Sequence, residues 1–183
     1  MKSRIPTDGR GQPRVTGSSA NSALYTAEQR QRRDASPWTL VQGILAPLQF
    51  LVFLVSVALV WRFLATGEGA QLATASVVLK TAVLYAIMIT GAIWERDVFG
   101  QYLFAGPFFW EDVVSMLVMA LHTLYLLCLA FGWLGIEGQM YVALAAYAAY
   151  ALNAAQFLFK FRQARRAGPD AAAPDGATLG ASS

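Results

Sequence analysis

The sequence predicts an all-α membrane protein, a polytopic bundle of four transmembrane helices with a disordered tail at each end. Hydrophobic residues make up 56% of the chain and charged residues only 14%, against about 45–50% and about 25% in soluble domains. Three stretches, 35–61, 113–136 and 138–159, contain no Asp, Glu, Lys or Arg, and a fourth, 69–94, contains only Lys80. Each stretch exceeds the roughly 20 residues that a helix needs to cross the hydrocarbon layer.

Helix boundaries follow from local signals within these stretches. Ser36 followed by Pro37 is typical of a helix start, because proline suits the first helical position. Pro47 lies inside the first span and should kink it. We expect the four spans at about 38–64, 72–94, 110–131 and 140–162.

The chain divides into one domain and two tails. Residues 1–24 are rich in Gly, Ser, Pro and Arg without periodicity, and 166–183 are rich in Ala, Gly and Pro, so both are predicted to be disordered. Residues 25–165 form the transmembrane domain, which begins with a short amphipathic segment at 25–34. The connection 95–112 mixes aromatic and charged residues, and we expect it to lie in the plane of the membrane interface.

Basic residues next to the spans predict the orientation. The turns 65–71 and 132–139 contain no Lys or Arg, whereas the two terminal flanks contain Arg30, Arg32, Arg33, Lys160, Arg162, Arg165 and Arg166. Basic flanks favour the cytoplasmic side, and four spans return the chain to the side from which it started. Both termini are therefore predicted to be cytoplasmic, with lipid headgroups rather than nucleic acid as the partner of the basic flanks.

Polar residues inside spans are candidates for function, since a charge at a helix centre costs about 2.5–3.5 kcal/mol on insertion scales. Glu111, Ser115 and His122 are spaced by four and seven residues, so they fall on one stripe of the third helix. We expect that stripe to face the bundle interior. Asp112 lies about a quarter-turn away, and Glu95 and Asp97 are expected just past the second helix.

These acids have two interpretations. They can simply mark helix ends, where carboxylates are favourable near a helix N-terminus. Alternatively, Glu95 and Glu111 each follow a tryptophan, Trp94 and Trp110, and a carboxyl group against aromatic rings is desolvated, which favours its protonated form. A protonated carboxyl group in such a place can act as a general acid.

The other polar residues of the spans also have more than one interpretation. His122 is structural if it bonds to another helix, and otherwise it carries protons or ligates a metal. Lys80 should either extend toward the interface or pair with a buried acid. Four amides share helix faces in pairs and can bond between helices or hold a polar edge of a substrate: Gln42, Gln49, Asn153 and Gln156.

Several classes of chemistry are not indicated. Cys128 is the single cysteine, which excludes an internal disulfide and a multi-cysteine metal site. The chain has no GxxxxGK, HExxH, CxxC or Ser-His-Asp spacing, so nothing points to nucleotide, zinc or acyl-transfer chemistry. We expect no protein-bound metal.

Four blocks of the chain resemble a known family. RRDASPWTLVQGILAPLQFLVF, WERDVFGQYLF, FFWEDVVSMLVMALHT and NAAQFLFK are similar to segments of the vinyl bacteriochlorophyllide hydratases, over about residues 25–165. The resemblance implies a hydro-lyase of bacteriochlorophyll synthesis in a photosynthetic bacterial inner membrane. It implies addition of water to the C3 vinyl group of chlorophyllide a or a related Mg-tetrapyrrole, which gives a 1-hydroxyethyl group.

Such a reaction assigns roles to the candidate residues as hypotheses. Glu111 is the first choice for the general acid, and Glu95 or Asp112 would orient or deprotonate the water. His122 would ligate the substrate's magnesium or relay protons, with the first slightly preferred. Arg96, Arg33 or Lys160 would meet the substrate's carboxylate. The reaction changes no overall oxidation state, so no cofactor is expected beyond the magnesium that the substrate carries.

Two other functions remain open from the residues alone. One is a pigment- or quinone-binding membrane protein without catalysis, in which His122 is the ligand and the acids only end helices. The other is an assembly factor for photosynthetic complexes that uses the aromatic 95–112 connection. Other enzymes of the same synthesis, or further copies of this chain, are candidate protein partners.

Overall fold

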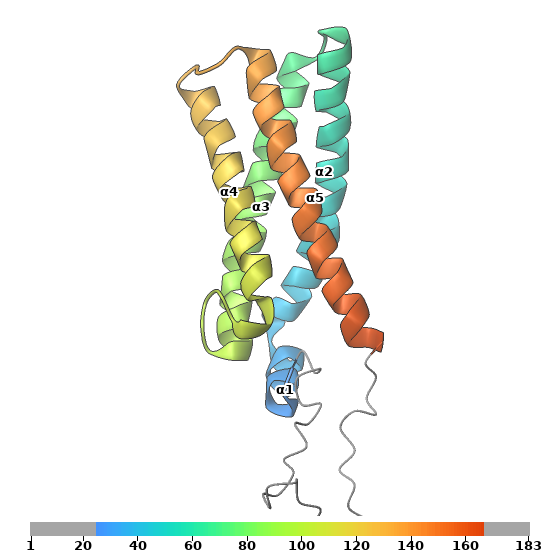
Figure 1. Cartoon of the computed structure of the whole chain (residues 1–183), viewed down its shortest axis with the longest axis vertical. Helices are drawn as coiled ribbons and strands as arrows, with labels where there is room; N and C mark the ends of the chain where they lie inside the picture. The colour runs from blue at the N-terminus through green and yellow to red at the C-terminus, as the bar shows by residue number, and fades with distance from the viewer. Residues whose placement is uncertain (1–24, 167–183) are drawn as a thin grey trace, which may run out of the picture. The chain divides into compact units, whose positions relative to one another are not determined.

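A computed structural model describes residues 25–166, which form five α-helices and one short 3₁₀ helix without any strand in that range (Figure 1). The all-α prediction is therefore confirmed. The segments predicted to be tails, 1–24 and 166–183, lie outside the described residues apart from Arg166. In chain order the elements are α1 (Ala27–Ala35), α2 (Pro37–Thr66), α3 (Ala70–Phe99), η1 (Gly106–Phe108), α4 (Phe109–Ala130) and α5 (Ile136–Arg166).

Four of these helices, α2 to α5, are long and apolar enough to cross a membrane. They run alternately away from and toward the end of the bundle at which α1 lies, which we call the α1 end (Figure 1). Large apolar side chains such as Leu51, Leu79 and Leu152 are exposed on their outer surfaces. This is the surface that lipid covers, and the chain is a multi-pass membrane protein.

The second span is longer than the sequence predicted. Helix α3 continues past residue 94 to Phe99 and ends where Gly100 adopts a left-handed conformation, with φ of 83°. Glycine takes this conformation without the strain that a Cβ atom would cause, and so it closes the helix. Glu95 and Asp97 therefore lie inside the helix, and the connection to η1 is only 100–105. Helix α2 continues through Pro47 as a single element.

Helix α1 is fixed to the bundle by its ends. At its start, the Thr26 and Gln29 side chains each accept from the other residue's backbone N–H, which forms a capping box. The preceding Tyr25 is buried and stacks on Phe99 with ring centroids 5.8 Å apart. Burial raises the pKa of Tyr25 to about 12, against the opposing effect of Arg33. After α1, Ser36 Oγ donates to Asp97 Oδ2 at 2.8 Å.

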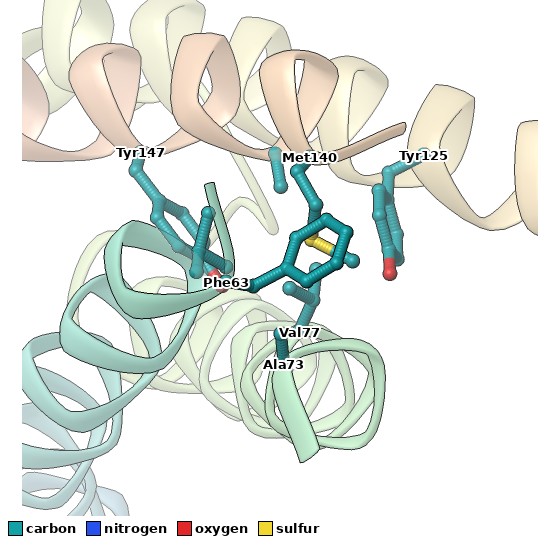
Figure 2. Packing of buried hydrophobic residues seen from close by; sticks show 8 residues of the cluster. Phe63, Ala73, Val77, Tyr125, Met140 and Tyr147 are labelled. Atoms are coloured by element: carbon teal, nitrogen blue, oxygen red, sulfur yellow. The ribbon is translucent and has the colours of Figure 1, made fainter. Parts of the chain in front are cut away.

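The main apolar core lies in the half of the bundle away from α1, and all four spans contribute to it. Figure 2 shows its side chains turned toward one another between the helices. Its buried members are Val60, Phe63, Ala73, Val77, Tyr125, Met140, Ala143 and Tyr147. Because lipid is as apolar as these side chains, close packing rather than exclusion of water holds this region together.

Small residues of α5 allow this packing, and one pair of alanines tests it. Ala146 is fully buried, whereas its neighbour Ala145 is exposed. We expect Ala146→Leu to lower the free energy of unfolding by about 1–3 kcal/mol, because extra methyl groups force packed helices apart. Ala145→Leu should leave it within about 0.5 kcal/mol. Unfolding in mixed micelles measures both, and equal stability of the two variants would contradict the packing.

Candidate active site at the α1 end of the bundle

Three buried carboxyl groups meet at the α1 end of the bundle. Glu95 lies in the last turns of α3, and Glu111 and Asp112 lie in the first turn of α4, with exposed fractions of only 5–7%. The two helices are antiparallel and joined by a short connection, so the end of one meets the beginning of the other. Buried acids without partners would be costly, and each of these three has polar neighbours.

The connection itself supplies donors to two of the acids. The Phe104 backbone N–H donates to Asp112 Oδ2 at 2.7 Å, and the Ala105 N–H donates to Glu95 Oε2 at 3.4 Å. Phe104 has a φ of 61°, a left-handed conformation that side chains rarely adopt, so the turn is held in a strained geometry here. The Glu95 and Asp112 carboxyl groups also lie close enough to influence each other.

Glu111 has a different partner, Lys160 of α5. The Lys160 Nζ lies 2.6 Å from Glu111 Oε2, donates to the Pro107 carbonyl oxygen and sits 4.9 Å from the centre of the Phe108 ring. This ion pair links the fourth span to the beginning of the third. From the sequence we expected Lys160 only in the basic flank and as a contact for the substrate. Nothing in a linear pattern shows that two residues 49 positions apart meet.

The two tryptophans that precede the glutamates lie differently. Trp94 is half-buried, donates from Nε1 to Thr39 Oγ1 at 2.9 Å and packs edge-on against Phe108. Trp110 is 70% exposed and contacts the neighbouring Phe109 ring. Trp94 thus forms part of the interior beside the acids, while Trp110 extends into the surroundings at the same level.

Ser115 and His122 continue the stripe of Glu111 into the bundle, and both are buried. Ser115 Oγ accepts from Asn153 Nδ2 at 2.7 Å. His122 is fully buried, and its Nδ1 lies 2.8 Å from the Val118 carbonyl oxygen. Since a carbonyl only accepts, Nδ1 carries the hydrogen, and in the neutral imidazole Nε2 then has the lone pair. Nε2 has no hydrogen-bond partner among the described residues.

The other predicted contacts lie further from the carboxyl groups. Gln42 donates to Thr90 Oγ1 at 2.7 Å and bonds α2 to α3, while Gln49 is buried with its Oε1 unpartnered in the described part of the chain. Gln156 is exposed, although the sequence placed it on a face with Asn153. Arg96 is exposed and donates to the Tyr102 hydroxyl.

Lys80 behaves in neither of the two ways that we expected. It is fully buried, so it does not reach the interface, and the described residues form no ion pair with it. Its Nζ lies 3.9 Å from the centre of the Tyr150 ring and has no hydrogen-bond partner in residues 25–166. A cation inside a membrane bundle is costly without a partner.

The α1 end therefore combines two buried carboxyl groups that interact with each other and a separate carboxylate held by a lysine. Such an arrangement can give a proton to one atom and take a proton from another, as enzymes that add or remove water require. The fold defines a membrane-embedded protein, and this set of groups suits acid–base chemistry.

Comparison with known proteins identifies the group to which it belongs. The family model "2-vinyl bacteriochlorophyllide hydratase" matches residues 25–163. A 2-vinyl bacteriochlorophyllide hydratase of Rhodobacter capsulatus is 62% identical over 160 residues, which cover 87% of this chain and 91% of the relative. One of Cereibacter sphaeroides is 66% identical over 147 residues, 78% of this chain and 88% of the relative. No solved structure matches.

The chain belongs to the 2-vinyl bacteriochlorophyllide hydratase family, and it is a hydro-lyase. The resemblance found in the sequence is confirmed.

The ion pair of the site makes a prediction about stability. Lys160→Met should lower the free energy of unfolding on the order of 2 kcal/mol, because it leaves the Glu111 carboxylate buried without its cation. The loss should be smaller than for a fully buried pair, since the two side chains are 24% and 10% exposed. Adding Glu111→Gln to Lys160→Met should restore part of the loss. Additive effects in this double-mutant cycle would contradict a direct interaction.

Proposed function

We propose that this protein adds water to the C3 vinyl group of chlorophyllide a or a closely related Mg-tetrapyrrole, giving the 3-(1-hydroxyethyl) product in bacteriochlorophyll synthesis. The observation that carries the proposal is the buried carboxyl cluster of Glu95, Glu111 and Asp112 in a chain whose relatives are named 2-vinyl bacteriochlorophyllide hydratases. That name also favours the hydratase over the two non-catalytic functions that the residues left open.

The chemistry of the reaction explains why acids are needed. Water does not attack an unactivated vinyl group, so a proton must first reach its terminal carbon and leave a cation on the adjacent carbon. Conjugation with the macrocycle spreads this positive charge and lowers the barrier. The oxygen of a water molecule then forms a bond to the cationic carbon and loses one proton to a base. One water is added overall, and no electron is lost or gained.

The contacts of the three acids favour a division of roles. The Glu95 and Asp112 carboxyl groups are buried and influence each other, and two close carboxyl groups favour holding one proton between them, so we assign this pair as the general acid. Glu111 already accepts from the Lys160 ammonium, and a carboxylate in an ion pair suits the general base that takes the proton of water. This assignment reverses our expectation from the sequence, in which Glu111 was the first choice for the acid.

The position of His122 bears on its two proposed roles. Eleven residues separate it from Glu111, about 16 Å along the helix at 1.5 Å per residue. This exceeds the distance between the metal and a peripheral vinyl group of one tetrapyrrole. A substrate whose magnesium met His122 could not place its vinyl group at Glu111. The geometry therefore favours a role for His122 other than magnesium ligation.

The substrate we propose is flat, largely apolar and anionic at its propionate, so it would approach from the lipid. Exposed aromatic side chains at the level of the acids, Phe109 and Trp110, offer a surface for its ring. Arg96 is exposed nearby and is the cation we assign to the propionate, because Lys160 is already paired. The reaction needs no cofactor other than the magnesium of the substrate itself.

We also propose that the membrane is the bacterial inner membrane or its photosynthetic extension, with the α1 end in the cytoplasm. Arg30, Arg32 and Arg33 lie in or next to the last turns of α1 at that end. The turns at the opposite end contain no Lys or Arg. Basic residues near spans favour the cytoplasmic side.

The central experiment is incubation of membranes that contain this protein with chlorophyllide a. We expect a product heavier by one water, with a red absorption band at shorter wavelength because conjugation with the vinyl group is lost. Glu111→Gln and Glu95→Gln should each lower kcat by about 10²–10⁴-fold, while chlorophyllide still binds. The Gln side chain at 111 still accepts from Lys160, so the fold should be retained.

Glu137→Gln is the matched control, because Glu137 is exposed in the first turn of α5 at the opposite end. It should leave kcat unchanged. An unaltered pigment, with wild-type protein and a series of vinyl tetrapyrroles, would refute the proposed reaction. Loss of binding in His122→Ala with full activity in Glu111→Gln would instead support a pigment-binding protein.

The orientation has its own test. Gln31→Cys in α1 and Gly135→Cys in the turn between α4 and α5 are both at exposed positions. In intact cells, a membrane-impermeant maleimide should label the second variant and not the first, and opened cells should allow both to react. The unaltered chain is the control, since Cys128 is buried. Labelling of Gln31→Cys in intact cells would contradict the proposed orientation.

A further inference from the structure

A layer of three buried polar side chains lies about one helical turn deeper in the bundle than the carboxyl groups. It consists of Gln49 of α2, Ser115 of α4 and Asn153 of α5, which are 3%, 4% and 9% exposed. Gln49 Oε1 and Asn153 Oδ1 have no hydrogen-bond partner among residues 25–166. We call these three residues the amide layer. The acid–base steps proposed above assign no role to it.

Ser115 and Asn153 place the layer directly below the Glu111–Lys160 ion pair. Asn153 Nδ2 donates to Ser115 Oγ at 2.7 Å, and this bond fixes the plane of the Asn153 amide. Ser115 lies four residues from Glu111 on the same face of α4, about 6 Å along the helix. Asn153 lies seven residues from Lys160 and shares its face of α5. Asn153 Oδ1 is therefore an acceptor that the fold holds close to the proposed base.

Two contacts between α2 and α5 set the level of the third member. The Ser56 hydroxyl bonds to the Tyr147 hydroxyl, and the centres of the Phe53 and Tyr150 rings lie 4.8 Å apart. Three residues backward on α2 thus match three residues forward on α5. The next step along the two helices brings position 50 of α2 level with position 153 of α5.

Gln49 is the inward-facing residue of α2 at this level. Phe50 is 46% exposed, whereas Gln49 is buried. Gln49 therefore lies within one residue, about 1.5 Å along the helix, of the level of Asn153. The two unpartnered amide oxygens are both acceptors, so they cannot bond to each other. A group that joins them must donate two hydrogen bonds.

A water molecule has two hydrogens to donate and is the smallest ligand that meets this need. Buried waters typically make about three hydrogen bonds to polar groups that lack other partners. We propose that Gln49 Oε1 and Asn153 Oδ1 bind a water molecule, and that this is the water consumed in the hydration. The inference rests on the proposed function, in which water is the second substrate.

A bound water answers a problem that an apolar bundle creates for this reaction. The cation that forms when the vinyl group takes up a proton has two courses. It either accepts the oxygen of water, which passes a proton to the base, or loses a proton from its new methyl group and becomes the vinyl group again. Water held one turn from Glu111 favours the first course. Gln49 and Asn153 are positioning residues in this proposal, because they act through the water.

The test is turnover of chlorophyllide a in deuterated water. The general acid then delivers deuterium to the terminal carbon, so a cation that loses a proton instead of capturing water leaves deuterium in the recovered vinyl group. Proton NMR of the terminal vinyl hydrogens measures this deuterium, and the amount of alcohol measures capture. The ratio of deuterated vinyl pigment to alcohol does not depend on the amount of folded protein, so a merely structural role would not change it.

Gln49→Met should raise this ratio about 3- to 10-fold, the effect expected from losing one neutral hydrogen bond to the water. Methionine is nearly as long as glutamine, and Gln49 Oε1 has no partner in residues 25–166 to lose. Asn153→Leu removes the other acceptor and should also raise the ratio. Gln156→Met is the matched control, because Gln156 is exposed on α5, and it should keep the wild-type ratio.

A second measurement locates the water without the pigment. An experimental density map that shows ordered water should contain a water peak within hydrogen-bonding distance of Gln49 Oε1 and Asn153 Oδ1. The peak should be missing in Gln49→Met. A wild-type map without this peak, or with one amide rotated so that Gln49 and Asn153 bond directly, would overturn the site.

The outcomes also separate this inference from the proposed function. An unchanged ratio in Gln49→Met would overturn the role of the water in the reaction, even with a water peak present and whether or not Asn153→Leu folds. Failure of the proposed function would appear differently, as wild-type protein that forms neither the alcohol nor deuterated vinyl pigment.

Discussion

The need to satisfy buried carboxyl groups inside an apolar bundle determines how the α1 end of this protein is built. Hydrocarbon offers no hydrogen bonds, so each buried carboxyl group must find its partners within the chain. The 100–105 connection supplies two backbone donors, and Lys160 reaches across from α5 to supply a cation. The left-handed turn at Phe104 is the conformational cost of aiming a backbone N–H at Asp112.

These partners make chemically different groups out of similar side chains. The carboxyl groups of Glu95 and Asp112 face each other, while Glu111 of the same cluster faces an ammonium. In water the three acids would behave almost alike, and the difference between them comes from the fold. A hydratase needs this difference, because one group must release a proton where another must accept one. In the proposed reaction, the helix ends that hold the three acids are therefore part of the chemistry.

The sequence was enough to predict the all-α class, the four spans and the inward stripe of α4, because long uncharged stretches and residue spacing are local signals. It also drew attention to Glu95, Glu111 and Asp112. It did not predict that Lys160 pairs with Glu111 or that Lys80 is wholly buried, since both depend on which helices become neighbours. The end of α3 was misplaced because charged residues were read as the end of a span, whereas Gly100 ends the helix.

The Lys160 side chain makes two contacts with the beginning of α4. It donates to the carbonyl of Pro107, just before α4, and to the carboxylate of Glu111. The C-terminal part of α5 is therefore bound to the start of α4 through one side chain. If the Lys160 ammonium moves away, the contact between α4 and α5 is weakened and the Glu111 carboxylate loses its cation. Separation of α4 and α5 at this point would therefore also expose Glu111 Oε2, because the same side chain holds both.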